Sequence, residues 1–324
     1  MMNKSAIDWC DFTWNPVTGC RHGCAYCYAR TMARRFCGDT RINRNDPQMD
    51  RFLDKNGRAY YHLAQPFKTQ RGAVCLVPAG FEPTFHEYRL PDPTRKKKPA
   101  TIFVVSMGDL FAEEIPAAWI DKVFQACEAA PQHNYMFLTK NPRRYQRLSA
   151  AGILPQRSNF WYGTSVPTPD THFFERAGYN TFISVEPISE TFEGAGKAIS
   201  QEVVRKLGWI IIGAETGNRK GKIYPERSWI EPIIEAAREA GVPVLMKDSA
   251  ELRAAWGDDL VREFPPQLRP MKEDNSVPHC RGCLAAEKRR QGKRGDTFTC
   301  KSTGQHVPSR YTRSSPPWCP RRKE

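Results

Sequence analysis

The 324-residue sequence contains no long hydrophobic run. Its longest apolar stretches, TIFVV and WIIIG, have the length of a β-strand and fall far short of the ~20 residues that span a bilayer. The first residues, MMNKSAIDWCDF, have no apolar signal core, and the sequence has no internal repeat. We therefore expect a cytoplasmic protein without a membrane partner.

The sequence also lacks the cysteine pattern of a disulfide-stabilised secreted protein. It contains 11 cysteines, an odd number, and seven of them fall into two groups. A chain of this length can bury a large core and does not need disulfides for stability. We interpret the two groups as metal sites in a reducing compartment.

Acidic residues are scarce in only one part of the chain. Residues 269–324 contain 14 Lys and Arg against 5 Asp and Glu, a net charge of +9, whereas the other 268 residues carry 35 against 30, or +5. A basic segment of this kind is typical of proteins that bind a polyanion, although a solubilising tail explains the charge equally well. Nucleic acid is therefore a candidate partner.

Apolar runs of strand length alternate with helical patterns along most of the chain. We expect strands at residues 7–14, 101–107, 134–140, 160–166, 181–187, 209–215 and 242–248, and helices at 116–130, 141–151, 170–178 and 228–240. Strands that are apolar on both faces and alternate with helices favour an α/β fold with a parallel sheet or barrel. Residues 37–98 lack this pattern, and we interpret them as an irregular insertion or lid.

Polar residues follow the apolar part of six expected strands. They are Ser106 and Asp109, Thr139 and Lys140, Thr164 and Ser165, Ser184 and Glu186, Glu215 and Thr216, and Lys247 and Asp248. The carboxyl ends of parallel strands meet at one edge of the sheet, where the active sites of α/β proteins lie. We therefore expect these residues to share a polar cavity.

Three cysteines occur close together in the segment GCRHGCAYCYAR, at Cys20, Cys24 and Cys27. A closed structural zinc site needs four ligands, and no fourth Cys or His lies at a suitable spacing. His22 is inside the segment, but we expect a loop wrapped around a metal to point it elsewhere. The glycines of the segment indicate a tightly turning loop rather than a buried one. The pattern favours a metal site with one open position over three buried thiols.

The C-x3-C-x2-C spacing, with an aromatic residue before the last cysteine, resembles the signature of the radical S-adenosylmethionine (SAM) superfamily. Together with SMGDLF, FLTKNPRRY, WYGTSV, SVEPI and WIIIGAETG it is similar to an uncharacterised phage and prophage family of radical SAM proteins. That family is distantly similar to spore photoproduct lyase and to DNA repair photolyase-like proteins. The resemblance covers about residues 5–265 and implies a partial (β/α) TIM-like barrel with the cysteine loop after the first strand.

The resemblance also implies a site. The three cysteines would hold a [4Fe-4S] cluster whose fourth iron is chelated by SAM. The implied cofactor-binding residues are Tyr26, Gly108, Asp109, Thr164, Ser165 and Glu186. The tyrosine would pack beside the adenine, the Gly-Asp pair stands in place of a Gly-Gly-Glu run that grips the SAM amine, and the other three would contact the ribose or methionine part. An external electron donor would then drive cleavage of SAM to a 5′-deoxyadenosyl radical that abstracts hydrogen from a substrate.

A second cysteine group, with the spacing C-x2-C-x16-C-x18-C, consists of Cys280, Cys283, Cys300 and Cys319. Four thiolates suffice for a tetrahedral zinc site, which would stabilise a segment with little core. His279 and His306 are possible substitutes, and an auxiliary iron–sulfur cluster is the main alternative. We therefore expect a radical SAM barrel domain at 1–265 and a basic, metal-binding C-terminal module at 266–324.

Three functions remain open at this point. The chain is a radical SAM enzyme that modifies or repairs DNA or RNA, a radical SAM enzyme acting on a peptide or small molecule, or a non-catalytic nucleic-acid-binding protein stabilised by metal. Arginines at 30–35 and 143–147 in helical segments favour nucleic acid, although arginines on helices often only face solvent. The open three-cysteine site and the polar strand ends favour an enzyme.

Overall fold

The computed structural model describes residues 2–192, 204–268, 286–289, 297–300, 303 and 305–307. The chain divides into two compact units, residues 1–270 and 271–324. Within the described ranges, no helix has both the length and the apolar character needed to cross a membrane.

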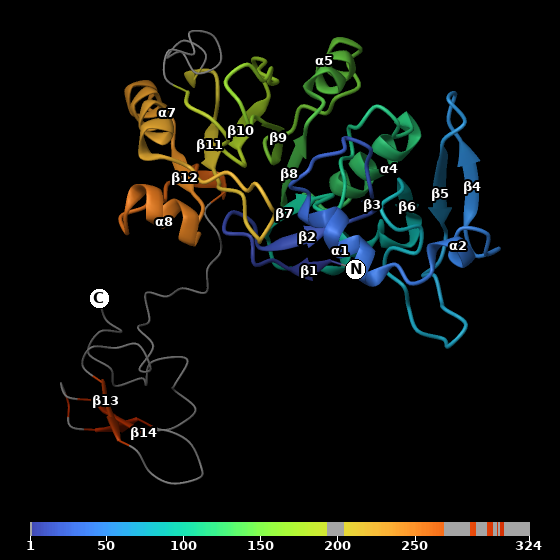
Figure 1. Ribbon diagram of the computed structural model, residues 1–324, viewed down its shortest axis with the longest axis horizontal. Helices are drawn as coiled ribbons and strands as arrows, with labels where there is room; N and C mark the ends of the chain where they lie inside the picture. Colours follow the sequence, from blue (N-terminus) through green and yellow to red (C-terminus); the bar gives the residue numbers. More distant parts are fainter. Residues whose placement is uncertain are drawn as a thin grey trace. The chain divides into compact units, whose positions relative to one another are not determined.

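An eight-stranded sheet organises the first unit (Figure 1). In spatial order its strands are β1 (Asn3–Lys4), β2 (Phe12–Trp14), β7 (Thr101–Val104), β8 (Asn134–Thr139), β9 (Phe160–Ser165), β10 (Asn180–Val185), β11 (Trp209–Ile212) and β12 (Val244–Met246). Strand β1 is antiparallel to β2, and all other neighbours are parallel. In the described part of the chain β1 and β12 are edges, so the parallel α/β class is confirmed and the sheet does not close into a barrel.

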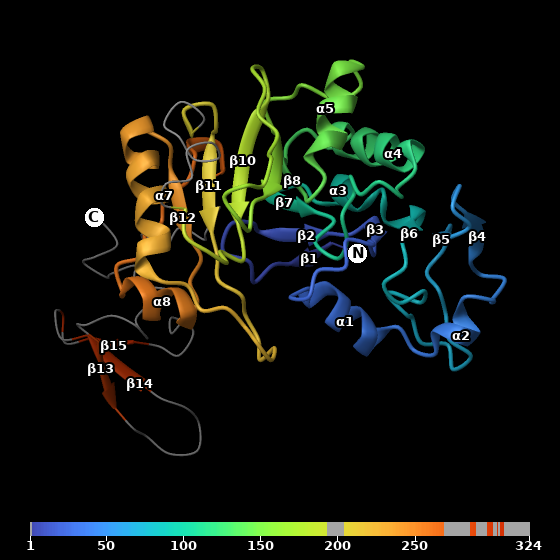
Figure 2. The same ribbon diagram turned by 45° about the horizontal axis from the view of Figure 1, so that its top comes forward.

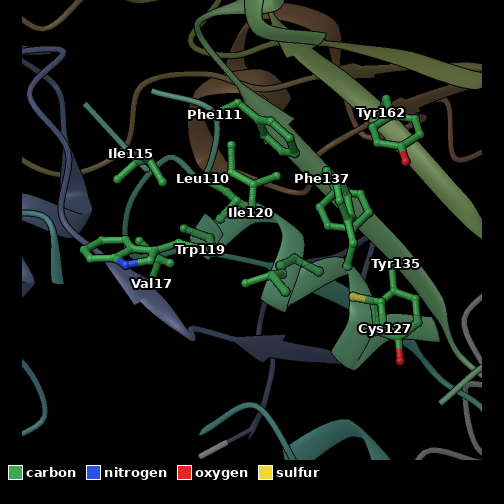
Figure 3. Packing of buried hydrophobic residues seen from close by; sticks show 14 of the residues in the cluster. Val17, Leu110, Phe111, Ile115, Trp119, Ile120, Cys127, Tyr135, Phe137 and Tyr162 are labelled. Atoms are coloured by element: carbon green, nitrogen blue, oxygen red, sulfur yellow. The ribbon is translucent and has the colours of Figure 1, made fainter. Parts of the chain in front are cut away.

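Helices cover the outer face of this sheet (Figures 1 and 2). Helices α4 (Ala117–Glu128) and α5 (Pro142–Ala150) pack on β7, β8 and β9, while α7 (Arg227–Ala240) and α8 (Ala250–Trp256) flank β11 and β12. In Figure 3, Cys127 of α4 lies beside Tyr135 of β8, whereas Trp119, near the start of the helix, lies beside Val17. Burial of apolar side chains on this scale provides most of the stability of the fold.

Aromatic side chains fill the inner face of the same sheet. Trp161 of β9, Phe182 of β10 and Trp209 of β11 join Trp9 and Phe103 in one buried cluster. Alternate residues of a strand point to the same face. Ser165 of β9 and Ser184 of β10 therefore lie on the same face as Trp161 and Phe182, nearer to the carboxyl ends of their strands. The polar ends of the strands therefore stand above an apolar floor.

Residues 37–98 are more regular than the sequence indicated. They contain α2 (Thr40–Asn43), β4 (Asp50–Leu53), β5 (Ala59–Leu63), β6 (Thr84–His86), the 3₁₀ turn η1 (Glu87–Arg89) and α3 (Asp92–Arg95). Their strands join β3 (Val17–Thr18) in a second sheet of order β3-β6-β5-β4. The expectation of an irregular segment is wrong because Tyr61, Leu63 and Phe67 give this part a small core of its own.

Two other expected elements differ from the structure. Residues 170–178 are not helical; Phe174 is buried among Tyr145, Tyr162 and Tyr179, and this packing fixes the segment in an irregular path. The first expected strand is shorter, since β2 begins at Phe12. The remaining expected strands and the helices at 116–130, 141–151 and 228–240 are present with small shifts at their ends.

The loop before β2 is tied to the far edge of the main sheet. The Asp8 carboxylate oxygen Oδ2 accepts hydrogen bonds from the backbone N–H of Asp248 and from Arg262 Nη1, both at 2.7 Å. Asp248 and Arg262 flank the last strand, β12, with the 3₁₀ turn η2 (Pro266–Leu268) following. This loop therefore connects the first and last parts of the sheet.

The described residues of the second unit form a small antiparallel sheet of β13 (Ala286–Arg289), β14 (Thr297–Cys300) and β15 (His306–Val307). Cys300 is buried at the end of β14. The other three cysteines of the expected metal site, Cys280, Cys283 and Cys319, lie outside the described residues.

Candidate functional site

A cavity of about 360 Å³ opens at the carboxyl ends of the parallel strands. Its volume falls within the range of roughly 300–1,000 Å³ that is usual for small-molecule sites. The residues of the expected site that line it are Cys20, Cys24, Tyr26, Cys27, Ser106, Gly108, Asp109, Thr139, Lys140, Ser165, Ser184, Glu186, Glu215, Thr216 and Lys247. The structure thus brings together the cysteine loop and the polar ends of six strands.

Two glycines hold the cysteine loop against the end of β7. The Gly19 N–H donates to the Met107 carbonyl at 2.8 Å, and Gly19 pairs with Gly108 as an isolated parallel bridge. A Cβ at Gly108 would lie 2.7 Å from the Gly19 oxygen, and one at Gly19, whose φ is +81°, would lie 2.5 Å from the Glu82 oxygen. Only glycine permits this close approach. Gly108 therefore positions the loop in addition to lining the cavity.

All three thiols of the loop face the cavity, and none forms a disulfide. Cys27 is the N-cap of α1 (Tyr28–Phe36), and its sulfur accepts a hydrogen bond from the Arg30 N–H at 3.3 Å. Burial raises the pKa of the Cys20 thiol to about 12, and coordination to a metal is the usual way in which such a thiol loses its proton.

The three thiols have the chemistry and number that an iron–sulfur cluster with one open iron requires. In the part of the chain that the structure describes, no three His, Cys, Asp or Glu side chains converge closely enough to hold one ion. In a cluster each thiolate binds a different iron, so the thiolates surround the cluster and need not meet at one point. The three free thiols line one cavity at a helix N-terminus, as thiolates that each bind a different iron of a cluster would.

Asp109 is buried beneath the loop, and both of its carboxylate oxygens accept hydrogen bonds. Oδ2 accepts from His22 Nε2 at 2.7 Å, Thr139 Oγ1 at 2.9 Å and the Lys140 N–H at 2.9 Å, and Oδ1 accepts from the Phe111 N–H at 2.9 Å. Burial alone would raise the pKa of Asp109, but these hydrogen bonds, with that from His22 foremost, hold it below its usual value. The same contact raises the pKa of His22.

This contact corrects the expectation that His22 points away from the site. Its ring lines the cavity because the buried Asp109 carboxylate holds it there. The pair ties the middle of the cysteine loop to the ends of β7 and β8. Binding of the SAM amine by Asp109 stays a prediction. The four hydrogen bonds that the carboxylate already accepts within the protein leave it little capacity for an amine.

Two lysines and a glutamate form the polar wall of the cavity. Lys140 Nζ donates to Ser165 Oγ at 2.8 Å and lies 5.7 Å from the centroid of the Tyr26 ring. Lys247 is ion-paired with Glu186. Burial raises the pKa of Tyr26 to about 12, so its hydroxyl stays protonated at neutral pH. The wall therefore offers positive and negative groups side by side.

Ser184 lies in the cavity wall without a partner for its hydroxyl. The residue is fully buried, and its Oγ has no hydrogen bond within the described ranges. The indole N–H of Trp9, another lining residue, is buried and unsatisfied in the same way. A buried polar group without a partner costs about 1–3 kcal/mol, so a ligand that reaches these atoms gains by pairing with them.

Two residues expected at the site lie elsewhere. Thr164 faces the helical layer, where its Oγ1 accepts from the Phe174 N–H at 3.1 Å, because neighbouring residues of a strand point to opposite faces and Ser165 takes the inward position. Asp248 is outside the cavity and forms an ion pair with Arg253 at 2.8 Å. The expectation that Thr164 binds the cofactor is thereby corrected.

Other lining residues were not anticipated. Phe81 reaches the cavity from the segment 37–98, and Trp9 comes from the loop before β2. Tyr28, which follows the last cysteine, donates its hydroxyl to the Ser106 carbonyl at 2.8 Å. The second tyrosine beside Cys27 was a visible signal for Tyr28, whereas nothing in the sequence placed Phe81 or Trp9.

Among solved structures, the chain is distantly similar to several of spore photoproduct lyase. The enzyme complexed with dinucleoside spore photoproduct gives a TM-score of 0.41 at 12% identity, covering 93% of this chain and 71% of that chain. A variant with one cysteine replaced by alanine gives 0.46 at 12% identity, covering 76% and 79%. A doubly substituted variant with bound AdoMet and dinucleoside spore photoproduct gives 0.40 at 12% identity, covering 93% and 71%. Likenesses this distant support no conclusion about the reaction of this chain.

No curated protein matches the sequence. One family model, described as Protein of unknown function (DUF5131), matches residues 4–304 and so includes the cysteine loop and every strand of the main sheet from Lys4 onward. Because the match extends over most of the sequence, the chain belongs to the family described as Protein of unknown function (DUF5131).

Proposed function

We propose that the chain is a radical SAM enzyme. The observation that carries this proposal is the set of three free thiols, spaced C-x3-C-x2-C, around one cavity at the carboxyl ends of a parallel sheet. Three thiolates leave one iron of a [4Fe-4S] cluster for an external ligand. Such a cluster, reduced by an external donor, supplies the electron that cleaves SAM to methionine and a 5′-deoxyadenosyl radical.

The residues around the cavity provide the binding groups for SAM. Cys20, Cys24 and Cys27 would hold the cluster. The ammonium of Lys140 and the hydroxyl of Ser165 lie together and suit a carboxylate or ribose oxygens. In this proposal Tyr26 packs beside the adenine, as the family resemblance implied.

Glu186 is the acidic group best placed to receive an amine, because it lines the cavity with its carboxylate beside Lys247. An incoming ammonium group would share or replace the lysine as its partner. Asp109, by contrast, is occupied by His22 and the end of β8, so its role is to position the cysteine loop.

The floor of the cavity is suited to a reactive intermediate. Trp9, Phe103 and Leu138 are apolar lining residues, and Phe81 covers the side next to the cysteine loop. An apolar enclosure excludes water, which limits side reactions of a radical. The radical would take a hydrogen atom from the substrate and leave as 5′-deoxyadenosine.

Reductive cleavage of SAM tests the proposal. The full-length protein, with its cluster reconstituted anaerobically, should convert SAM to 5′-deoxyadenosine and methionine in equal amounts when dithionite is added, as measured by chromatography and mass spectrometry. The same sample without reductant is the control. A protein that carries the full amount of iron and sulfide but forms no 5′-deoxyadenosine contradicts the proposal.

We also propose that the substrate is DNA or RNA, to be modified or repaired. The support is the charge distribution, +9 in residues 269–324. The helical arginines give less support than the sequence suggested. Arg30 stacks on Phe81 with its guanidinium carbon 5.2 Å from the ring centroid, and Arg147 is paired with Glu113 at 2.5 Å.

For the C-terminal unit we propose a zinc site at Cys280, Cys283, Cys300 and Cys319. The support is the four-cysteine spacing and the burial of Cys300. The full-length protein should contain about one zinc per chain, the content of one tetrahedral site, and a chain ending at Gln267 should contain none while it keeps its iron. Elemental analysis measures both metals. Absence of zinc from the full-length protein, with iron and sulfide lost on truncation, would establish an auxiliary cluster instead.

A further inference from the structure

A second cavity, of about 610 Å³, is lined mainly by arginines. We call it the arginine cleft. Its lining arginines are Arg21, Arg41, Arg44, Arg51 and Arg58, accompanied by Asn45, Ala59, Tyr61 and Glu82. The arginines come from four separate segments: the cysteine loop, α2 and its C-cap, β4, and the turn between β4 and β5. The fold therefore gathers these charges from distant parts of the sequence.

The arginine cleft and the first cavity share a wall. Cys20 and His22 line the first cavity, whereas Arg21 between them lines the cleft. In the same way Phe81 lines the first cavity and Glu82 lines the cleft. These two segments touch, because a Cβ at Gly19 would lie 2.5 Å from the Glu82 oxygen. A ligand in the cleft is thus separated from the cysteine site only by the thickness of this wall.

The cleft carries an excess of positive charge. The carboxylates paired with its arginines are Asp39, Asp54 and Glu82, which makes three acidic groups against five arginines. Arg51, an exposed residue of β4, has no ion pair within the described ranges. Arg41 has a carboxylate partner, but its side chain is 90% exposed. Surface ion pairs of this kind are weak, so both side chains are available to another anion.

Arg21 anchors the wall and still has an unused donor. Its Nη2 donates to Glu82 Oε2 at 2.7 Å and to the Ala59 carbonyl. Its Nη1 is buried, has no hydrogen-bond partner in the described part of the chain, and lies 4.0 Å from Asp54 Oδ2. The planar guanidinium group matches phosphate oxygens with two parallel donors. The exposed guanidinium groups of Arg41 and Arg51 are therefore the donors of the cleft that are most open to a phosphate.

We propose that the arginine cleft binds the phosphates of a nucleic-acid strand while a neighbouring nucleotide of that strand enters the first cavity. One phosphate needs only two or three donors, whereas five arginines from four segments suit a chain with several phosphates. The shared wall keeps backbone and reacting nucleotide close together. This inference rests on the proposed function and assigns it a substrate class.

Equilibrium binding of a fluorescently labelled 12-nucleotide single-stranded DNA to the full-length protein, followed by anisotropy across a salt series, tests this inference. The variant replaces Arg41→Gln and Arg51→Gln. The control replaces Arg157→Gln and Arg238→Gln, which removes the same charge from exposed residues outside the cleft, one in the loop before β9 and one on α7. We expect the cleft variant to bind about tenfold more weakly or worse, and its salt slope to be shallower by about one to two. The control should stay within about twofold of the original protein.

Equal weakening of both variants would overturn the cleft inference, because general charge would then explain the binding. Competition by a mononucleotide as effective as by the oligonucleotide would also overturn it, and would indicate a small nucleotide as ligand. Unchanged melting temperatures show that the variants are folded. If the cleft variant binds the oligonucleotide as tightly as the original protein, and the protein still forms 5′-deoxyadenosine, then the cleft inference is wrong but the proposed enzyme stands. If binding depends on the cleft arginines but the protein never cleaves SAM, then the proposed radical SAM activity is wrong but the cleft inference stands.

Discussion

Replacing any one of Cys20, Cys24 or Cys27 with alanine should remove about four irons per chain and abolish the formation of 5′-deoxyadenosine. All three thiols face one cavity, and the cluster needs every one of them to leave a single iron open. A cluster held by two thiolates is exposed to solvent and loses iron during anaerobic purification. Iron, sulfide and 5′-deoxyadenosine measured on the same reconstituted samples provide the test.

Cys75→Ala is the matched control for these variants. Cys75 is another buried free thiol, but its sulfur donates to the Phe36 carbonyl at 3.2 Å and it does not line the cavity. Its replacement should leave the iron content unchanged. Retention of full iron by all three loop variants, or an equal loss in the control, would show that the loop does not hold the cluster.

Asp109→Asn should lower the free energy of unfolding by about 3 kcal/mol or more, the usual cost of breaking a buried charged contact. The carboxylate accepts four hydrogen bonds. An amide keeps only one acceptor oxygen, so its NH2 group must face either the Phe111 N–H or the three donors that Oδ2 serves, and the charge that pairs with His22 is lost. Because His22 lies between Cys20 and Cys24, the cysteine loop should also bind iron less tightly. Urea unfolding followed by circular dichroism measures the first effect, and iron retention the second.

Asp121→Asn provides the comparison for Asp109→Asn. Asp121 is an exposed residue of α4 whose carboxylate accepts from Gln125 one turn further along the same helix. Its replacement should change the free energy of unfolding by less than about 0.5 kcal/mol, as is usual for surface positions. If the two variants are equally stable and retain the same iron, Asp109 does not hold the loop.

The main sheet was predictable because its strands are apolar on both faces and bounded by polar residues. The same pattern located the cavity, since inward residues such as Ser165 and Glu186 follow buried runs. Because neighbouring residues of a strand point to opposite faces, the sequence also indicates that only one of Thr164 and Ser165 can line the cavity. It does not show which of the two faces is the inner one. That depends on which side the helices cover.

The parts that were missed depend on contacts between distant segments. Residues 170–178 have a helical pattern, yet Phe174 is fixed by packing on Tyr145 and Tyr162. His22 is directed by a carboxylate 87 residues away. The arginine cleft is formed jointly by the segment 37–98 and the cysteine loop, so no local sequence pattern predicts it.

The electron paramagnetic resonance spectrum of the reduced, reconstituted full-length protein, recorded with and without SAM, tests whether the cysteine loop holds a cluster with one open iron. We expect the signal of a reduced [4Fe-4S] cluster whose shape changes when SAM is added, because SAM would bind the iron that lacks a thiolate, and we expect no such signal from Cys24→Ala. A cluster signal that is identical with and without SAM would contradict the open site, and a protein that binds no iron–sulfur cluster under these conditions would show that the chain is not a radical SAM enzyme.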